Sequence, residues 1–340
     1  MNFEDLEKID SKKMYQVYDE WPKIAETNYH IEHKEIELDE FDDIVFAGMG
    51  GSGVIGDIFS SILSRTSKYT SVIKGYHLPK TVNSKTLVVI TSVSGNTIEA
   101  LSILKKAREV GTNIISFSSG GMLQEICKKN NINHARIDMI NSPRASLTAY
   151  LYNMLNILGE HLSIERGEIE ISIKELKETA RTNSYHNLTQ SNFSLGLAKW
   201  ITKTPIIYYP WGLHAVANRF KNSLQENAKM HAIAEDVIEA SHNGIVAWEK
   251  QKKFQPILIQ GENDFIKTKE VWKIIKTYFK NNDIDFREVY TKNTGILSKI
   301  INSIYLLDIV SIYKAVLLGI DVTPVKSISF IKSKLGREVL

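Results

Sequence analysis

Short apolar runs alternate along the first half of the chain with longer segments whose apolar positions recur at helical spacing. The mainly β-branched runs predict five buried strands, at 44–47, 71–73, 87–90, 113–117 and 135–137. Helical spacing predicts helices over 98–110 and 145–160, and Gly111 predicts a left-handed end to the first of them. Strands that alternate with helices indicate a parallel sheet covered on both faces. We therefore expect a three-layer α/β/α domain.

The same alternation restarts in the second half. Strands are predicted at 205–209, 256–260 and 286–290, and helices at 214–230, 267–279, 297–318 and 326–335. The expected organisation is a first domain over 1–160 that includes one or two outer helices within 1–38, a helical connector over 161–195, and a second α/β domain over 196–340. No repeat relates the two halves in sequence, so any symmetry between them is architectural.

Composition narrows the possible partners. The 340 residues are 43% hydrophobic and 24% charged, and the net charge of +3 comes from scattered lysines. This predicts a soluble protein that does not bind nucleic acid but tolerates a small anionic substrate. Cys127 is the only cysteine and the chain starts with polar, acidic residues, so we expect a cytoplasmic protein. The apolar stretch 304–320 contains Asp308 and Lys314, and we expect it to be too short and too charged to span a membrane.

The stretch Ser92-Val93-Ser94-Gly95-Asn96-Thr97 follows a predicted buried strand and precedes a predicted helix. A helix N-terminus offers unpaired N–H groups, and the hydroxyls of Ser92, Ser94 and Thr97 can bond phosphate oxygens. The same residue types are also common helix caps. The stretch alone leaves both an anion site and a simple cap open.

A glycine-rich loop follows the first predicted strand, with Gly48, Gly50 and Gly53 in a G-x-G-x-x-G pattern. A dinucleotide site would need an acid after the second strand, where Lys74-Gly75-Tyr76-His77 stands instead. No lysine follows as a P-loop requires. The pattern therefore favours a loop in which Gly50, Gly51 and Ser52 let a smaller ligand approach the backbone. Because both loops leave the carboxyl ends of parallel strands, we expect them to converge.

The predicted helix 214–230 carries Glu226 on the same side as Arg219, off the apolar stripe. On spacing alone this side is best interpreted as a solvated charged face, with a general base as the alternative. His242 stands at a loop junction where a histidine can act as a general acid, although a single histidine is more often structural. The histidines and Cys127 form no metal-ligand spacing, so no metal site is expected.

Together these motifs resemble the sugar isomerase (SIS) domain, a phosphosugar-binding fold. The further combination of Arg219-Phe220-Lys221, Gln225-Glu226-Asn227-Ala228-Lys229 and His242-Asn243 resembles the bifunctional phosphoglucose/phosphomannose isomerases, which are known chiefly from archaea. The C-terminal segments 307–313, 319–325 and 331–332 also fit. The resemblance runs from about residue 41 to the end, and it implies two SIS-type domains.

The resemblance also implies roles for particular residues. Phosphate would be held by six of them: Gly50, Gly51, Ser52, Ser92, Ser94 and Thr97. Glu226 would be the base, Arg144 would stabilise an enediolate, and Lys332 would face the substrate. His242 would help to open the sugar ring from the partner subunit of a homodimer. The implied reaction interconverts glucose 6-phosphate and mannose 6-phosphate with fructose 6-phosphate, without a cofactor or a metal.

Two positions depart from the family pattern. An acid usually follows His-Asn, where this chain has Gly244, and a proline usually follows the Asp of the C-terminal turn, where it has Val322. Two alternatives to the isomerase remain. One is a non-catalytic sugar-phosphate sensor on the same fold, which would need the serine loops but no base. The other is an amino-sugar phosphate isomerase, for which the sequence offers no N-terminal glutaminase nucleophile.

Overall fold

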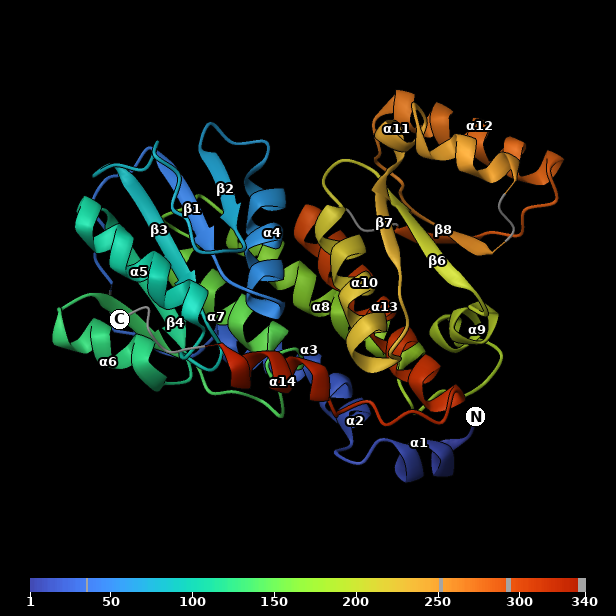
Figure 1. The fold of residues 1–340 in the computed structure, drawn as a ribbon, viewed down its shortest axis with the longest axis horizontal. Helices are drawn as coiled ribbons and strands as arrows, with labels where there is room; N and C mark the ends of the chain where they lie inside the picture. The colour runs from blue at the N-terminus through green and yellow to red at the C-terminus, as the bar shows by residue number, and fades with distance from the viewer. Residues whose placement is uncertain (35, 251–252, 292–294, 336–340) are drawn as a thin grey trace. The chain divides into compact units, whose positions relative to one another are not determined.

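A computed structural model describes residues 1–34, 36–250, 253–291 and 295–335 (Figure 1). The chain forms two compact units, each built on its own sheet. The first-sheet unit contains Glu20–Ile169 and Val325–Leu340, and the second-sheet unit contains Met1–Asp19 and Glu170–Pro324. Both sheets are wholly parallel and both are flanked by helices, which confirms the predicted α/β class.

The first sheet has the order β2-β1-β3-β4-β5. Its strands are β1 (Asp43–Ala47), β2 (Tyr69–Ile73), β3 (Thr86–Thr91), β4 (Asn113–Ser118) and β5 (Asn133–Arg136). The unit's helices are α3 (Trp21–Tyr29), α4 (Gly51–Leu63), α5 (Ile98–Val110), α6 (Gly121–Lys129), α7 (Leu147–Leu158) and α14 (Lys326–Lys334). Gly111 ends α5 in the left-handed region, at φ 75° and ψ 40°, as predicted. The apolar residues of β1 and β3 pack against those of α5 and α6 in one core.

The second sheet has the order β7-β6-β8-β9, which repeats the order of the first four strands of the other sheet. Its strands are β6 (Thr204–Tyr209), β7 (Ile233–Asp236), β8 (Phe254–Gly261) and β9 (Arg287–Thr291). The sequence missed β7, because Ile-Ala-Glu-Asp lacks an apolar run and none of its residues is buried. Its pairing with the buried strand β6 makes it a strand.

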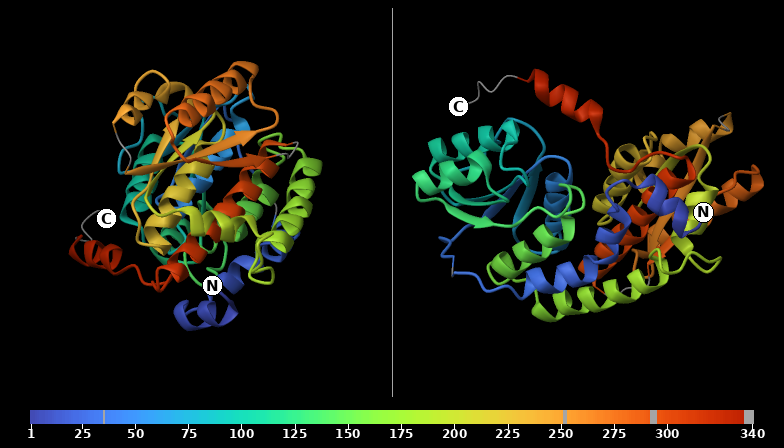
Figure 2. Two further views of the ribbon diagram at one scale, coloured as in Figure 1. Left: turned by 90° about the vertical axis from the view of Figure 1, so that its right-hand side faces the viewer. Right: turned by 90° about the horizontal axis from the view of Figure 1, so that it is seen from below.

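Helices α10 (His214–Asn227) and α13 (Ile296–Leu317) pack together in the second-sheet unit. α12 (Ile266–Asn281) and the short α11 (Val237–Ala240) pack with β6 and β8 in a separate core, and the left panel of Figure 2 shows the orange α12 alongside these strands. α8 (Arg166–Asn183) begins in the first-sheet unit and continues into the second. α9 (Phe193–Trp200) packs against α13, and a 3₁₀ turn spans Gly244–Glu249.

The leading helices α1 (Phe3–Ile9) and α2 (Met14–Asp19) belong to the second-sheet unit, where both contact α13. This differs from the expected grouping, which placed them as outer helices of a domain over 1–160. The apolar side chains of Leu6, Met14 and Tyr18 are fully buried, and the Ser11 amide donates to the Asp321 side chain 310 residues away. Sparse apolar positions thus anchor this segment to the far end of the chain.

Helix α13 is longer than the expected apolar stretch. With 22 residues it is long enough and apolar enough to cross a membrane by length and composition alone, so the arguments from length and from charge against a span were both wrong. However, 89% of its apolar window is buried in the structure. That environment is the one a core helix of a soluble protein has.

Candidate functional site

The glycine loop and the Ser92–Thr97 loop leave neighbouring strand ends in the first sheet. β1 and β3 are adjacent and parallel, and Ala47 pairs with Ile90 at their carboxyl ends. The strand order reverses at this point, since β2 lies beyond β1 and β4 beyond β3. A crevice at such a switch point is where open parallel sheets bind ligands.

The hydroxyls of the Ser92–Thr97 loop do not cap α5. Thr97 occupies the N-cap position, but its side chain accepts no hydrogen bond from the helix. Instead the Ser92 hydroxyl, on a residue only 2% exposed, donates to the Thr97 hydroxyl at 2.9 Å. Ser94 is exposed, and its hydroxyl accepts from the Asn96 amide at 3.3 Å. The first turn of α5 thus lacks a side-chain cap, which favours the anion interpretation.

Gly95 locks this loop to the loop after β4. Its φ is +67°, and a Cβ at this position would lie 1.7 Å from the Gly120 carbonyl oxygen. Around this contact the Leu123 amide donates to the Gly95 carbonyl, the Met122 amide to the Asn96 side chain, and the Ser119 amide to the Val93 carbonyl. No side chain fits at Gly95 while these bonds persist.

The glycines of the loop after β1 are required for different structural reasons. A Cβ at Gly48 would meet Ser52 at 2.9 Å, and a Cβ at Gly53 would meet the Gly48 carbonyl oxygen at 2.8 Å. Gly50 has φ +54° with open space where a Cβ would be, and it begins α4 without a side-chain cap. Packing therefore explains two of these glycines, whereas the backbone at Gly50 faces space that a ligand can occupy.

Lys74 occupies the place where a dinucleotide site would need an acid. Its ammonium pairs with the Asp57 carboxylate of α4 at 2.5 Å, and its side chain packs beside Gly53. A cation tied to α4 cannot accept the ribose hydroxyls, so the exclusion of a dinucleotide site has a structural basis.

Arg144 lies in the turn before α7 and is only 5% exposed. The turn is held by the Ser146 hydroxyl, which accepts from the Ile140 amide at 2.8 Å, and by Trp21, whose indole donates to the Ala145 carbonyl at 3.0 Å. A buried guanidinium on a fixed turn is a positioned cation of the kind that stabilises a developing oxyanion.

The polar side of α10 is not a solvated charged face, contrary to the preferred interpretation of its spacing. Arg219, Ser223 and Asn227 recur every four residues and are each at most 2% exposed. Asp308 of α13 is fully buried and accepts from the Arg219 guanidinium, with a closest distance of 2.7 Å, and from the Ser223 hydroxyl. Asn227 donates to the Ser311 hydroxyl at 2.8 Å. A buried polar seam therefore fixes α10 against α13.

Glu226 lies in the last turn of α10, half-buried beside this seam. Burial opposes the charge of Arg219, but Asp308, Tyr18 and Glu226 act in the other direction and leave the pKa of Arg219 raised. Lys229 follows at φ +56°, and its ammonium contacts the Glu226 and Asn227 carbonyl oxygens at 2.5 and 3.4 Å. The cation stabilises the end of the helix by bonding its last carbonyl oxygens, among them the main-chain oxygen of Glu226.

His242 lies in the turn after α11 and is exposed, with no hydrogen-bond partner for its imidazole among the described residues. Two residues later a Cβ at Gly244 would lie 2.6 Å from Oε2 of Glu235, at the end of β7. That oxygen is buried without a hydrogen-bond partner in the described chain, and burial raises the pKa of Glu235. Sequence reasoning missed Glu235, since only the fold brings it to the His242 turn. The Glu235 carboxyl lies next to Gly244, so a side chain at position 244 would require the Glu235 side chain to shift.

The other departure, Val322, is fully buried in the second-sheet unit. Lys332 lies on α14, which is red in Figure 2 and buries none of its residues. The six phosphate candidates, Arg144 and Lys332 all lie in the first-sheet unit, whereas Glu226 and His242 lie in the second-sheet unit. No group of three His, Cys, Asp or Glu side chains that could hold a metal occurs among the described residues.

Known proteins share this architecture and this sequence pattern. Residues 190–335 match the model of the bacterial phospho-glucose isomerase C-terminal SIS domain. The C-terminal domain of a glucosamine-fructose-6-phosphate aminotransferase from Francisella tularensis superposes with a TM-score of 0.68 at 17% identity, over 92% of this chain and 98% of that one. Fold and loops thus define an SIS-domain protein.

Curated relatives narrow this class. Bifunctional phosphoglucose/phosphomannose isomerases from Caldicellulosiruptor bescii and Aquifex aeolicus are each 30% identical, covering 88% and 94% of this chain and 91% and 95% of their own. A D-glucosamine-6-phosphate 4-epimerase from Sulfolobus acidocaldarius is 29% identical over 73% of this chain and 78% of its own. The chain belongs to the family of bifunctional phosphoglucose/phosphomannose isomerases, and it is an isomerase.

Proposed function

We propose that this enzyme interconverts glucose 6-phosphate and mannose 6-phosphate with fructose 6-phosphate through an enediolate. The observation that carries the proposal is the N-terminus of α5, which has no side-chain cap and lies at the switch point of the first sheet among three hydroxyls. That arrangement suits a phosphate monoester, because N–H groups and hydroxyls bond its oxygens and the helix dipole favours its charge.

In this mechanism the phosphate binds the loops of Ser52, Ser92 and Thr97, with the exposed Ser94 at the rim. The open space beside Gly50 lets the ligand approach the backbone of α4. The phosphate is the inert end of the sugar, so these residues position the substrate and take no part in the proton transfers.

Proton transfers fall to Glu226 and His242. His242 moves a proton at the ring oxygen and opens the sugar, a task that suits an exposed imidazole with room for a substrate. Glu226 then removes the C2 proton and returns it to C1, while the proton of the C2 hydroxyl passes to O1. The enediolate between these steps carries negative charge, which the cation of Arg144 stabilises, while Lys332 faces the substrate.

One base serves both aldoses because glucose and mannose differ only at C2. The enediolate is planar at C2 and has lost that stereocentre. Rotation about C2–C3 within the site presents either face of the intermediate to Glu226, so both epimers lead to fructose 6-phosphate. The proposed chemistry uses neither a metal nor a cofactor.

The decisive experiment measures turnover of both aldose phosphates by the wild type, by Glu226→Gln and by the control Glu249→Gln, an exposed carboxylate of the same unit. We expect Glu226→Gln to lose at least about a hundredfold in kcat, since a positioned base contributes that much, and the control to retain activity. EDTA should leave the rates unchanged. Undiminished activity in Glu226→Gln would refute the base assignment.

Further substrates separate the alternatives. Binding of glucose 6-phosphate without turnover of either aldose would support the sensor. Turnover of glucosamine 6-phosphate in place of glucose 6-phosphate would support an amino-sugar enzyme, which the epimerase relative makes worth testing.

We further propose a cytoplasmic homodimer in which His242 completes the site of the partner subunit. The exposed apolar side chains of Ile328, Phe330 and Ile331 on α14 support an interface, as does the His242 imidazole, which has no hydrogen-bond partner among the described residues of its own chain. Light scattering gives the oligomeric state directly.

Co-expression of Glu226→Gln with His242→Ala tests the sharing. If the histidine acts across the interface, one site in each mixed dimer contains both wild-type residues. About a quarter of wild-type activity then returns, because half of randomly paired dimers are mixed. A histidine that acts within its own chain leaves every site defective and returns no activity.

A further inference from the structure

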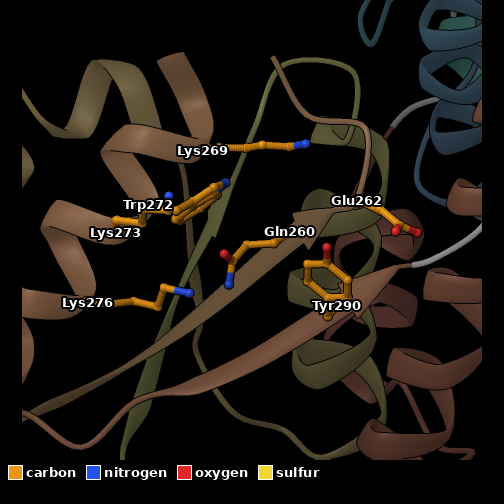
Figure 3. A pocket seen from close by; sticks show the side chains of 8 residues that line it. Gln260, Glu262, Lys269, Trp272, Lys273, Lys276 and Tyr290 are labelled. Carbon is orange, nitrogen blue, oxygen red and sulfur yellow. The ribbon is translucent and has the colours of Figure 1, made fainter. Parts of the chain in front are cut away.

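A cavity of about 360 Å³ opens at the carboxyl ends of β8 and β9 in the second-sheet unit (Figure 3). Three lysines of α12 line it together with residues from the two strands and the loop after β8. The residues that matter here are Gln260, Glu262, Lys269, Lys273, Lys276 and Tyr290. None of the residues proposed for catalysis is among its lining residues.

Two of the three lysines carry charge that no described residue neutralises. Lys276 pairs with the Glu288 carboxylate at 2.9 Å, and the same carboxylate oxygen accepts from Gln260 at 2.7 Å. In contrast, the described residues give the ammonium groups of Lys269 and Lys273 no hydrogen-bond or ion-pair partner. These two groups lie one helical turn apart, so the cavity presents a local excess of positive charge to an anion.

The cavity occupies the place in the second sheet that the Ser92–Thr97 loop occupies in the first sheet. β8 occupies the place in its sheet that β3 occupies in the first, next to the strand where the order reverses. The loop after β8 leads into α12, just as the Ser92–Thr97 loop leads into α5, and α12 also begins without a side-chain cap. Both sheets thus place groups that attract anions at the equivalent edge.

The walls of the cavity also select for more than charge. Trp272 forms a rigid wall, because it is 2% exposed and its indole donates to Asp264, which also accepts from the Gly261 amide. Tyr290 is 52% exposed and offers a ring face, and the exposed Glu262 carboxylate can accept from hydroxyl groups. The volume lies in the range of small-ligand pockets.

We propose that this cavity is a second binding site, for a small phosphate ester that carries a hydroxylated ring. Lys269 and Lys273 bond the phosphate, Glu262 accepts from ring hydroxyls, and Tyr290 packs against the ring. Sugar phosphates and nucleoside monophosphates share this chemistry. The site does not depend on the function proposed above, since it lies on separate residues.

Lysine reactivity tests the site residue by residue. The full-length protein is acetylated with acetic anhydride and analysed by mass spectrometry, alone and with glucose 6-phosphate or AMP. We expect acetylation of Lys269 and Lys273 to fall about fivefold or more at saturating ligand. Lys280, which is exposed on the same helix and does not line the cavity, serves as the internal control. Whichever ligand protects at the lower concentration identifies the source.

Control ligands distinguish binding at a defined site from non-specific screening of the lysine charges. Glucose and adenosine should protect neither lysine, and sulfate at matched ionic strength should protect both much less than the phosphate esters. Equal protection by sulfate, or none by either ester at millimolar concentration, would overturn the proposal. The Lys269→Gln/Lys273→Gln variant should bind the protecting ester about tenfold or more weakly than Lys280→Gln. Equal binding by the two variants would also overturn the proposal.

Discussion

Replacement of Gly95 by alanine should separate the Ser92–Thr97 loop from the loop after β4, which contains Gly120. These two loops lie side by side at the carboxyl-end edge of the first sheet and are called the rim here. The added methyl would lie 1.7 Å from the Gly120 carbonyl oxygen, whereas non-bonded heavy atoms need about 3.5 Å. Three hydrogen bonds link the loops, with distances of 2.9 to 3.1 Å, and at about 1 kcal/mol each their loss costs about 3 kcal/mol. The left-handed backbone adds about 1–2 kcal/mol for a residue with a Cβ.

Gly111→Ala is the matched control. Gly111 has a similar φ of +75°, but a Cβ there meets nothing within 4 Å, so only the backbone cost of about 1–2 kcal/mol applies. For a unit of this size about 1 kcal/mol corresponds to roughly 2–4 °C, so we expect Gly95→Ala to melt roughly 10 °C lower than the wild type and Gly111→Ala about 3 °C lower.

Activity should separate the two variants further. A displacement of about 1 Å in a substrate-positioning loop can cost about a hundredfold in kcat/KM, and only Gly95 contacts the rim. The assays are thermal unfolding by circular dichroism and kinetics with each aldose phosphate. Similar melting temperatures for the two variants, with kcat/KM for Gly95→Ala at the wild-type value, would refute this reasoning.

Three more predictions follow from the seam, the His242 turn and the first sheet. Asp308→Asn should lower the free energy of unfolding in urea by about 3 kcal/mol, because Arg219 stays charged and buried; a change below about 0.5 kcal/mol would contradict this. Gly244→Ala should lower the melting temperature of the wild type, because the added Cβ would lie 2.6 Å from Oε2 of Glu235. The same substitution should lower it much less in a Glu235→Ala background, where that oxygen is absent. Equal shifts in both backgrounds would rule out that contact. Burial lowers the pKa of His134 to about 4 from an ordinary 6.5, so the folded state binds fewer protons there than the unfolded state. The stability of the wild type should therefore fall as the pH drops from 6.5 towards 4. Melting temperatures measured across that range should fall less for His134→Gln than for the wild type.

Much of the fold was predictable because its signals are local. The helix over 98–110 and its glycine cap follow from apolar spacing and from the one residue that tolerates φ 75° without a side-chain penalty. Most strands were also found, since buried parallel strands have continuous apolar runs. β7 was missed for the converse reason: its four residues are at most partly buried.

The candidate site was predictable in part. Ser92, Thr97 and the glycine loop belong to short motifs, so the local sequence was enough to identify them as candidate binding residues. Glu235 had no such signal, because its relation to Gly244 depends on how a strand end and a later turn pack. Arg219 was misjudged because helical spacing separates a polar side from an apolar one, but not a buried polar side from a solvated one.

The sequence by itself determined the α/β class, the two sheets, the serine and glycine loops and the residues that resemble an isomerase, since each of these depends on neighbours within a few positions. Only the tertiary structure decided that Arg219 meets Asp308, 89 residues away, that Gly95 meets Gly120, that the first helices pack with the last long one, and that three lysines line a cavity. The physical reason is common to all four. A contact between segments distant in the chain depends on how the strands pair and on which helix faces a sheet buries, and local patterning specifies neither.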